Sequence, residues 1–157
     1  MDLILWRHAE AHEAKPGQDD LDRALTAKGE RQAERMAAWL NRLLPSSTRV
    51  LASPARRTQQ TVAAFERKFK TVDALRPDAG VDALLHATRW PEGREPVLVI
   101  GHQPTLGLAA AYLMTREAEP WTLRKGAVLW LRGREREREG ETELQVLLHA
   151  AMAPELL

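Results

Sequence analysis

The sequence contains no cysteine, which excludes disulfide bonds, zinc–thiolate sites and cysteine nucleophiles. It also has no excess of either charge, because 23 lysines and arginines face 22 aspartates and glutamates for a net charge of +1. No overall field therefore favours nucleic acid or an anionic membrane as a partner. No apolar run approaches the roughly 20 residues of a membrane span, and the run before Arg7 is too short for a signal peptide. We expect a cytoplasmic protein.

The length of 157 residues fits one core, and we expect a single domain spanning residues 1–157. Three short apolar runs lack polar alternation: Leu3–Trp6, Val50–Ala52 and Val97–Ile100. Uninterrupted apolar runs are typical of strands in a parallel sheet that is covered by helices on both faces. The pattern predicts an α/β fold, a three-layer sandwich with a mostly parallel central sheet flanked by helices.

Helix-start signals stand between and after these runs. They are Thr26 before a helix that ends at Pro45, Ser53-Pro54 before a second helix, and Gln103-Pro104 before a third. A small polar residue can cap the first turn, and proline is favoured at the first helical position because its missing N–H has no partner there. In the second helix, Val62, Phe65 and Phe69 are expected to form one apolar stripe.

The C-terminal part has a different pattern. Ala127–Leu131 is a fourth apolar run, and Leu144, Val146 and Leu148 alternate with other residues, which predicts a strand pair at one antiparallel edge of the sheet. Between them, the connecting segment Arg132–Glu141 contains arginines that alternate with glutamates from Arg134 to Glu139. Because the two signs cancel, we interpret this segment as a solvated loop with no role in binding nucleic acid.

Each predicted parallel strand ends in residues suited to chemistry. Arg7-His8 follows the first strand, Arg57 lies just after the second, and His102 follows the third. Since the carboxyl ends of parallel strands share one edge, where open α/β sheets bind ligands, these side chains should converge. Arginine offers phosphate a planar fork of donors, and nearby helix N-termini add unpaired N–H groups. The cluster therefore predicts a phosphate site.

Four motifs in this order resemble the histidine phosphatase superfamily, whose fold is phosphoglycerate mutase-like, and within it the short SixA-like phosphohistidine phosphatases. They are Arg7-His8-Ala9-Glu10, Arg23-Ala24-Leu25-Thr26 with Gly29, the segment from Ser53 to Thr61, and Gly101-His102-Gln103-Pro104. Together they extend over most of the chain. One departure is Ala9, which stands where the family usually has glycine.

The resemblance implies a division of roles among these residues. His8 attacks phosphorus and carries the phosphoryl group, while Arg7, Arg57 and His102 hold its oxygens, and Arg23 is a further candidate for binding the phosphate. The chemistry agrees, since a neutral imidazole is a good nucleophile and arginine keeps its charge. Water would then release the phosphate, and no cofactor or metal ion is expected.

The proton donor for the leaving group is not evident. Many relatives use a carboxylate, but the region before the third strand offers only Asp78, Asp82 and His86, without a decisive motif. A phosphohistidine substrate depends less on such an acid, because its nitrogen leaving group can already be protonated. The short segment between Phe69 and Val97 also leaves little room for a lid over a small metabolite. Both points favour a phosphorylated protein, such as a histidine phosphotransfer domain, as partner.

Other functions remain open from the sequence. The same fold could support a small-molecule phosphomonoesterase or a mutase, and a pocket without turnover would be a non-catalytic module that binds phosphorylated ligands. His8, Glu10 and His12 also suggest a metal hydrolase, because His-x-Glu begins the zinc deaminase signature. The second half of that signature requires cysteines, which this chain lacks. We therefore favour the phosphatase.

Overall fold

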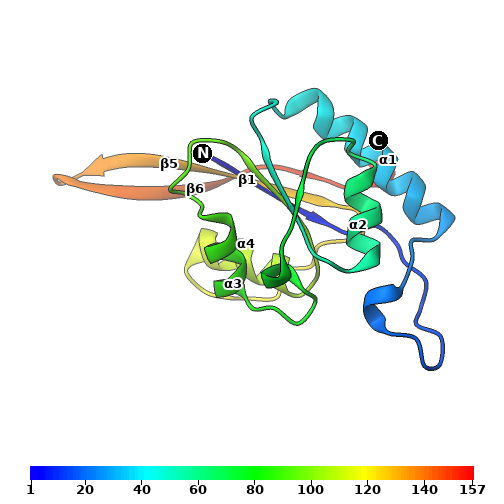
Figure 1. Cartoon of the computed structure of the whole chain (residues 1–157). Helices are drawn as coiled ribbons and strands as arrows, with labels where there is room; N and C mark the ends of the chain where they lie inside the picture. Colours follow the sequence, from blue (N-terminus) through cyan, green and yellow to red (C-terminus); the bar gives the residue numbers. More distant parts are fainter.

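Six strands form one mixed sheet in the computed structural model, which describes residues 1–157 (Figure 1). They are β1 (Asp2–Arg7), β2 (Arg49–Ala52), β3 (Lys70–Thr71), β4 (Val97–Gly101), β5 (Val128–Arg138) and β6 (Glu141–Met152). Their order across the sheet is β3-β2-β4-β1-β5-β6. The first four strands run parallel, whereas β5 pairs antiparallel with both β1 and β6. The expected mostly parallel sheet with an antiparallel edge is confirmed.

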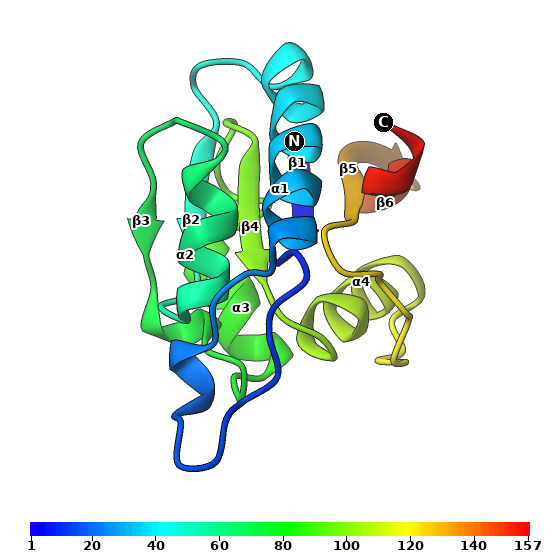
Figure 2. The ribbon, with the colours of Figure 1, turned by 90° about the vertical axis from the view of Figure 1, so that its right-hand side faces the viewer.

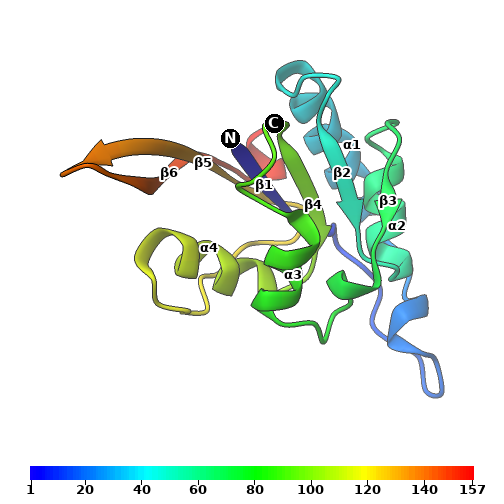
Figure 3. The same ribbon diagram turned by 60° about the vertical axis from the view of Figure 1, so that its left-hand side comes forward.

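Helices cover both faces of this sheet (Figures 2 and 3). The helices α1 (Ala27–Leu43) and α2 (Arg56–Ala63) pack on one face, and α3 (Val81–Thr88) and α4 (Thr105–Thr115) pack on the other. Short 3-10 turns are η1 (Asp20–Asp22), η2 (Asp73–Leu75) and η3 (Pro154–Leu156). None of the helices combines the length and the apolar character that a membrane span requires.

The two faces explain why β1 is apolar at successive positions. Ile4 and Trp6 point into the core under α1 and α2, whereas Leu3 and Leu5 point into the core under α3 and α4. All four side chains are fully buried. A strand that has a core on each side needs apolar residues in both alternating sets, so the pattern of a doubly covered strand is confirmed.

The helix starts agree with the sequence in part. Thr26 caps α1 as expected, since its Oγ1 accepts a hydrogen bond from the Gly29 N–H at 3.0 Å. The third start is also nearly correct: α4 begins at Thr105, one residue after Pro104, and the side-chain oxygen of Gln103 accepts a hydrogen bond from the Gly107 N–H at 2.7 Å.

The second helix differs from the prediction at both ends. α2 begins at Arg56, because the hydroxyl of Ser53 accepts the Ala55 N–H at 3.2 Å and fixes a turn before the helix. It ends at Ala63, so Phe65 and Phe69 lie beyond it and the predicted stripe was wrong. Phe65 is nevertheless fully buried, with its ring against Trp6 at a centroid distance of 6.4 Å.

The segment interpreted as a solvated loop is instead a long hairpin that extends beyond the body of the molecule (Figure 3). Strand β5 continues to Arg138, and only Glu139 and Gly140, both with positive φ, separate it from β6. Arginines of one strand stand opposite glutamates of the other, as in the pairs Arg136–Glu143 and Arg138–Glu141. Such cross-strand pairs stabilise a ribbon that is exposed on both faces.

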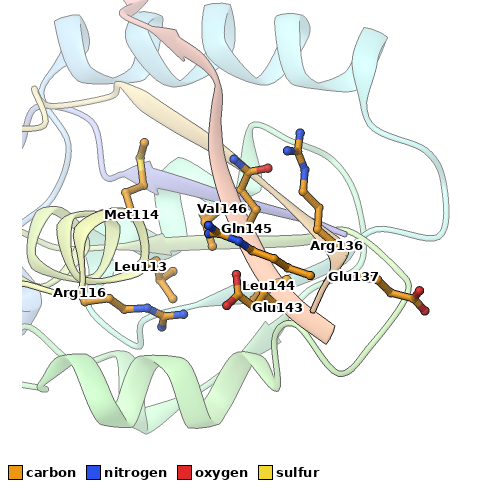
Figure 4. A pocket seen from close by; sticks show the side chains of 10 residues that line it. Leu113, Met114, Arg116, Arg136, Glu137, Glu143, Leu144, Gln145 and Val146 are labelled. Carbon is orange, nitrogen blue, oxygen red and sulfur yellow. The ribbon is translucent and has the colours of Figure 1, made fainter. Parts of the chain in front are cut away.

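A hollow of about 580 Å³ lies between this hairpin and the end of α4 (Figure 4). Its lining includes Leu113, Met114 and Arg116 from the region of α4, together with Leu144 and Val146 from β6. None of the residues that the motifs single out borders it. The candidate site is therefore elsewhere, at the opposite end of β1.

Candidate active site

The carboxyl ends of β1, β2 and β4 bring the predicted residues together. In Figure 2 the arrowheads of β3 and β4 point to the lower edge of the sheet, where the dark blue segment after β1 also runs. His8 follows β1, and its ring lies beside that of His102, which follows β4, with 5.2 Å between the ring centroids. Arg57, in the first turn of α2, contacts His102. The convergence expected from the strand endings is present.

Hydrogen bonds fix His8 in one orientation. Its backbone N–H donates to the carbonyl of Gly101, and its own carbonyl accepts from the Gly126 N–H. Its ring Nδ1 lies 2.7 Å from the carbonyl oxygen of Ala9. Because a carbonyl only accepts, Nδ1 carries the proton, and the lone pair of a neutral ring is then on Nε2.

Hydrogen bonds also define the tautomer of His102. Its Nδ1 lies 3.4 Å from Nη2 of Arg57, which can only donate, so Nδ1 accepts. Nε2 then donates to the Ser53 hydroxyl at 2.7 Å. Ser53 therefore connects the end of β2 to the ring that follows β4, a contact that the sequence motifs did not predict.

Both histidines are neutral at physiological pH. Burial, followed by the charges of Arg57 and Arg7, lowers the pKa of His8 to about 3, although the hydrogen bond to Ala9 opposes the shift. Burial also lowers the pKa of His102 to about 3, and the neighbouring His8 and Arg57 act in the same direction. A neutral imidazole between arginines is a nucleophile that needs no separate base to deprotonate it.

Backbone carbonyls hold both arginines of the site. Arg7 donates from Nη1 to the Leu123 carbonyl at 2.9 Å, and Arg57 donates from Nη1 to the Asp20 carbonyl at 2.8 Å. The Nε–H groups of both are buried and have no hydrogen-bond partner. Burial lowers the pKa of each, and the charge of Arg57 contributes to the shift of Arg7. Buried unpaired donors are costly, so the protein neighbours of the two guanidiniums leave both of them incompletely satisfied.

Arg23 makes no hydrogen bond to His8 or His102 and contacts the cluster through Asp20. Its Nε donates to Oδ1 of Asp20 at 2.9 Å and its Nη1 donates to the carbonyl of His12. The charge of Arg23 still lowers the pKa of His8. Asp20 was missed by the sequence reasoning, although it stands three residues before Arg23 in the second motif, and its Oδ2 accepts from Arg57 at 3.1 Å.

The unassigned candidates for a proton donor make no polar contact with this cluster. The side chains of Asp78, Asp82 and His86 are exposed and make no hydrogen bond or ion pair with any histidine or arginine of the site. Asp20 is the carboxylate that contacts the site arginines. Burial raises its pKa, but Arg23 and Arg57 outweigh that effect and hold the pKa below its ordinary value of 3.8.

The residues of the metal-hydrolase alternative do not gather either. Glu10 accepts a hydrogen bond from the Thr26 hydroxyl at 2.7 Å, at the start of α1, and the side chain of His12 is exposed. No three His, Cys, Asp or Glu side chains in the chain form a group that could hold a metal ion.

The low pKa values of the two histidines predict how stability depends on pH. In the unfolded chain each ring binds a proton near pH 6.5, whereas in the folded chain it does so only near pH 3. The unfolded state therefore binds more protons across this window, and acidification favours unfolding. The free energy of unfolding should fall by up to about 1.4 kcal/mol per pH unit for each histidine as the pH drops from 6.5 to 4.

Urea unfolding at pH 7 and pH 4.5 measures this effect. A His102→Asn variant should lose less stability than wild type between the two pH values, because one of the two proton-binding differences is gone. Equal losses for the two proteins would contradict the low pKa of His102.

Comparison with known proteins identifies the family. The model of the histidine phosphatase superfamily (branch 1) matches residues 3–81. The phosphohistidine phosphatase SixA of Escherichia coli is 33% identical over 128 residues, which cover 76% of this chain and 78% of that protein. An uncharacterized protein of Picosynechococcus is 30% identical over 156 residues and 94% of each chain.

A solved structure of the protein histidine phosphatase SixA complexed with tungstate is similar over nearly the whole fold. It superposes with a TM-score of 0.76 at 26% identity, covering 98% of this chain and 97% of that chain. The family expected from the four motifs is confirmed, and the chain belongs to the histidine phosphatase superfamily, a family of phosphatases.

Proposed function

We propose that this chain is a metal-independent phosphatase that forms phosphohistidine on Nε2 of His8 and acts on phosphohistidine in proteins. The observation that carries the proposal is the neutral ring of His8, which has its lone pair on Nε2 and lies beside His102. Arg7 and Arg57 are close enough to His8 for their charges to lower its pKa. A phosphoryl group in line with Nε2 would lie close to these two guanidiniums and accept hydrogen bonds from them.

The reaction divides into two displacements. In the first, the lone pair on Nε2 of His8 attacks phosphorus, the bond from phosphorus to the leaving group breaks, and the leaving group departs with its electron pair. In the second, water attacks phosphorus, the P–Nε2 bond breaks, and inorganic phosphate leaves with the oxygen and protons of the water. The Nδ1–H bond to the Ala9 carbonyl holds the ring throughout and stabilises the positive charge of the phosphorylated imidazole.

The two arginines bind the charge on the transferred group. Positioning and electrostatic stabilisation of the equatorial oxygens account for most of the catalysis of phosphoryl transfer, and arginine is suited to both. That a relative was solved in complex with tungstate supports the proposal of an oxyanion site, because tungstate, like phosphate, is a tetrahedral oxyanion. We infer that His102 orders the Arg57 guanidinium through its Nδ1, because its one N–H group, on Nε2, is bound to the Ser53 hydroxyl and is not free for a phosphoryl oxygen.

The leaving group is the basis for preferring phosphohistidine. Asp20, the carboxylate in the cluster, is bound through both oxygens to arginines and has a lowered pKa, so it is ionised and is a poor proton donor. An alkoxide leaving group needs a donor, whereas an imidazole that carries a proton on its other nitrogen leaves as a neutral ring. A phosphoramidate therefore matches the groups that surround His8.

Phosphate release in the presence of EDTA tests the proposal. We expect the purified protein to hydrolyse a phosphotransfer domain that carries phosphohistidine with a kcat/KM about 100-fold or more above that for an alkyl phosphate. This ratio is the usual contribution of a general acid, which the alkoxide leaving group needs and this site does not supply. EDTA should leave both rates unchanged.

Each alternative function gives a different result. Preference for the alkyl phosphate would indicate a small-molecule phosphomonoesterase. Loss of activity with EDTA and its recovery with zinc would indicate a metal hydrolase. Tight binding of the phosphorylated domain without any phosphate release would indicate a non-catalytic module.

A further inference from the structure

Asp20 lies between two arginines in the segment that joins β1 to α1. Its Oδ1 accepts from Nε of Arg23 at 2.9 Å, and its Oδ2 accepts from Nη2 of Arg57 at 3.1 Å. Its backbone carbonyl accepts from Nη1 of Arg57 at 2.8 Å. The side chain of Arg57 is only 3% exposed, whereas that of Asp20 is 55% exposed. Asp20 therefore sits on the solvent side of the arginine.

These contacts divide the guanidinium of Arg57 into two edges. The outer edge, Nη1 and Nη2, is bound by Asp20, and Nη2 also faces Nδ1 of His102. The inner group, Nε–H, is buried and unpartnered. A planar guanidinium that is held along one edge has its orientation fixed, so Asp20 determines how the guanidinium of Arg57 is placed in the site.

The position of Asp20 is itself restrained. Its segment is closed at the base by a bridge between Ala11 and Leu25, and the Leu25 N–H donates to Oε1 of Gln60 in α2 at 2.7 Å. Within the segment, Arg23 donates to the carbonyl of His12 at 2.9 Å. Figure 2 shows this dark blue segment extending along the lower edge of the molecule, in front of the strand ends.

We propose that Asp20 is a positioning residue and the internal counter-ion of Arg57, which aligns the guanidinium for the phosphoryl group and weakens retention of the released phosphate. The proposal rests on the proposed function, in which Arg57 binds the phosphoryl oxygens. In this role Asp20 favours turnover over tight binding of the product. The site binds the phosphoryl group during its transfer and releases the phosphate ion afterwards.

The charge balance of the cluster explains why a counter-ion is useful. Arg7, Arg23 and Arg57 bring three positive charges toward two histidines that are neutral. Without a nearby negative charge, a phosphate dianion would be held by all three. The lowered pKa of Asp20 keeps its carboxylate ionised at neutral pH, so its repulsion of the product is always present.

An Asp20→Asn variant separates charge from position, since the amide keeps a side-chain oxygen that can accept from Arg57 but has no charge. Calorimetry with inorganic phosphate, and with tungstate as a second probe, should give about fivefold tighter binding, the effect of one partly solvated charge near the anion. The matched control is Asp22→Asn in the same 3-10 turn, whose exposed carboxylate makes no ion pair or hydrogen bond. This control should bind phosphate as wild type does.

An Asp20→Ala variant tests position. It loses the side-chain contact with Arg57, so kcat should fall about tenfold, the usual order for one misplaced positioning group, while Asp20→Asn should keep kcat within about threefold of wild type. Both variants remove the ion pairs of the turn. If Asp20 only stabilised the turn, the two variants should therefore lose kcat alike, whereas a positioning role predicts that asparagine restores kcat and alanine does not.

Several results would overturn the proposal. Unchanged or weaker phosphate binding by Asp20→Asn would show that the charge does not act on the anion. Equally tighter binding by Asp22→Asn would show a general surface effect, and full kcat in Asp20→Ala would remove the positioning role. Anion binding needs no turnover, so the comparison can also be made in a His8→Ala background, where it stands or fails independently of the phosphohistidine intermediate.

Discussion

Replacing His8 by alanine is expected to lower the rate of phosphate release by at least about 1000-fold, as removal of a nucleophile generally does. The variant should remain folded, because the His8 ring makes one hydrogen bond, to the carbonyl of the adjacent Ala9, and belongs to no apolar cluster. Arg7 and Arg57 remain in place, so binding of phosphate or tungstate should persist while turnover is lost. Steady-state assays with a phosphohistidine protein and calorimetry with tungstate measure the two properties separately.

A matched control for this variant is His12→Ala. His12 lies four residues further along the same segment, its side chain is exposed, and only its backbone groups make hydrogen bonds. The control should retain wild-type turnover. A His8→Ala protein that keeps its activity, or a His12→Ala protein that loses it, would contradict the role given to His8.

The second large effect concerns stability, at Gly29 in the first turn of α1. A Cβ built on Gly29 would lie 2.0 Å from the backbone oxygen of Glu10, a contact that side-chain movement cannot relieve. A Gly29→Ala substitution must therefore separate α1 from the segment that follows His8, breaking the bond from the Thr26 N–H to the Glu10 carbonyl. We expect the free energy of unfolding to fall by about 3 kcal/mol or more, at the upper end of overpacking effects.

Gly80→Ala is the control for this substitution. Gly80 precedes α3 with φ of −87°, and nothing lies within 4 Å of a Cβ built there. Its replacement should change the free energy of unfolding by less than about 0.5 kcal/mol, as is usual for open surface positions. Urea unfolding of the three proteins measures both effects, and a Gly29→Ala protein as stable as wild type would show that α1 can move without cost.

The sheet and the site were predictable because their signals are physical and local. Strands β1, β2 and β4 are apolar at consecutive positions since both of their faces are buried, and parallel strands necessarily end at one edge. The grouping of His8, Arg57 and His102 followed from that geometry alone. The motifs then added the family and the roles.

The parts that were missed or wrong depend on tertiary contacts. Asp20 belongs to an irregular segment with no apolar period, and only the placement of Arg57 and Arg23 gives it a partner. The alternating charges from Arg134 to Glu139 suit an exposed hairpin as well as they suit a loop, because neither state buries the side chains. A serine before a proline fits either a helix N-cap or a turn that precedes the helix. Ser53 forms the turn, and its hydroxyl also bonds to His102.

The phosphohistidine at His8 is the central intermediate of the proposed reaction. The most direct measurement is to mix the enzyme rapidly with a phosphohistidine protein, quench in base, in which phosphohistidine survives, and locate the phosphoryl group by mass spectrometry and phosphorus NMR. We predict an acid-labile phosphoryl group on Nε2 of His8 that forms and decays at least as fast as steady-state turnover. A phosphoryl group on Nδ1 or on another residue, or full turnover with no adduct at His8, would contradict the account.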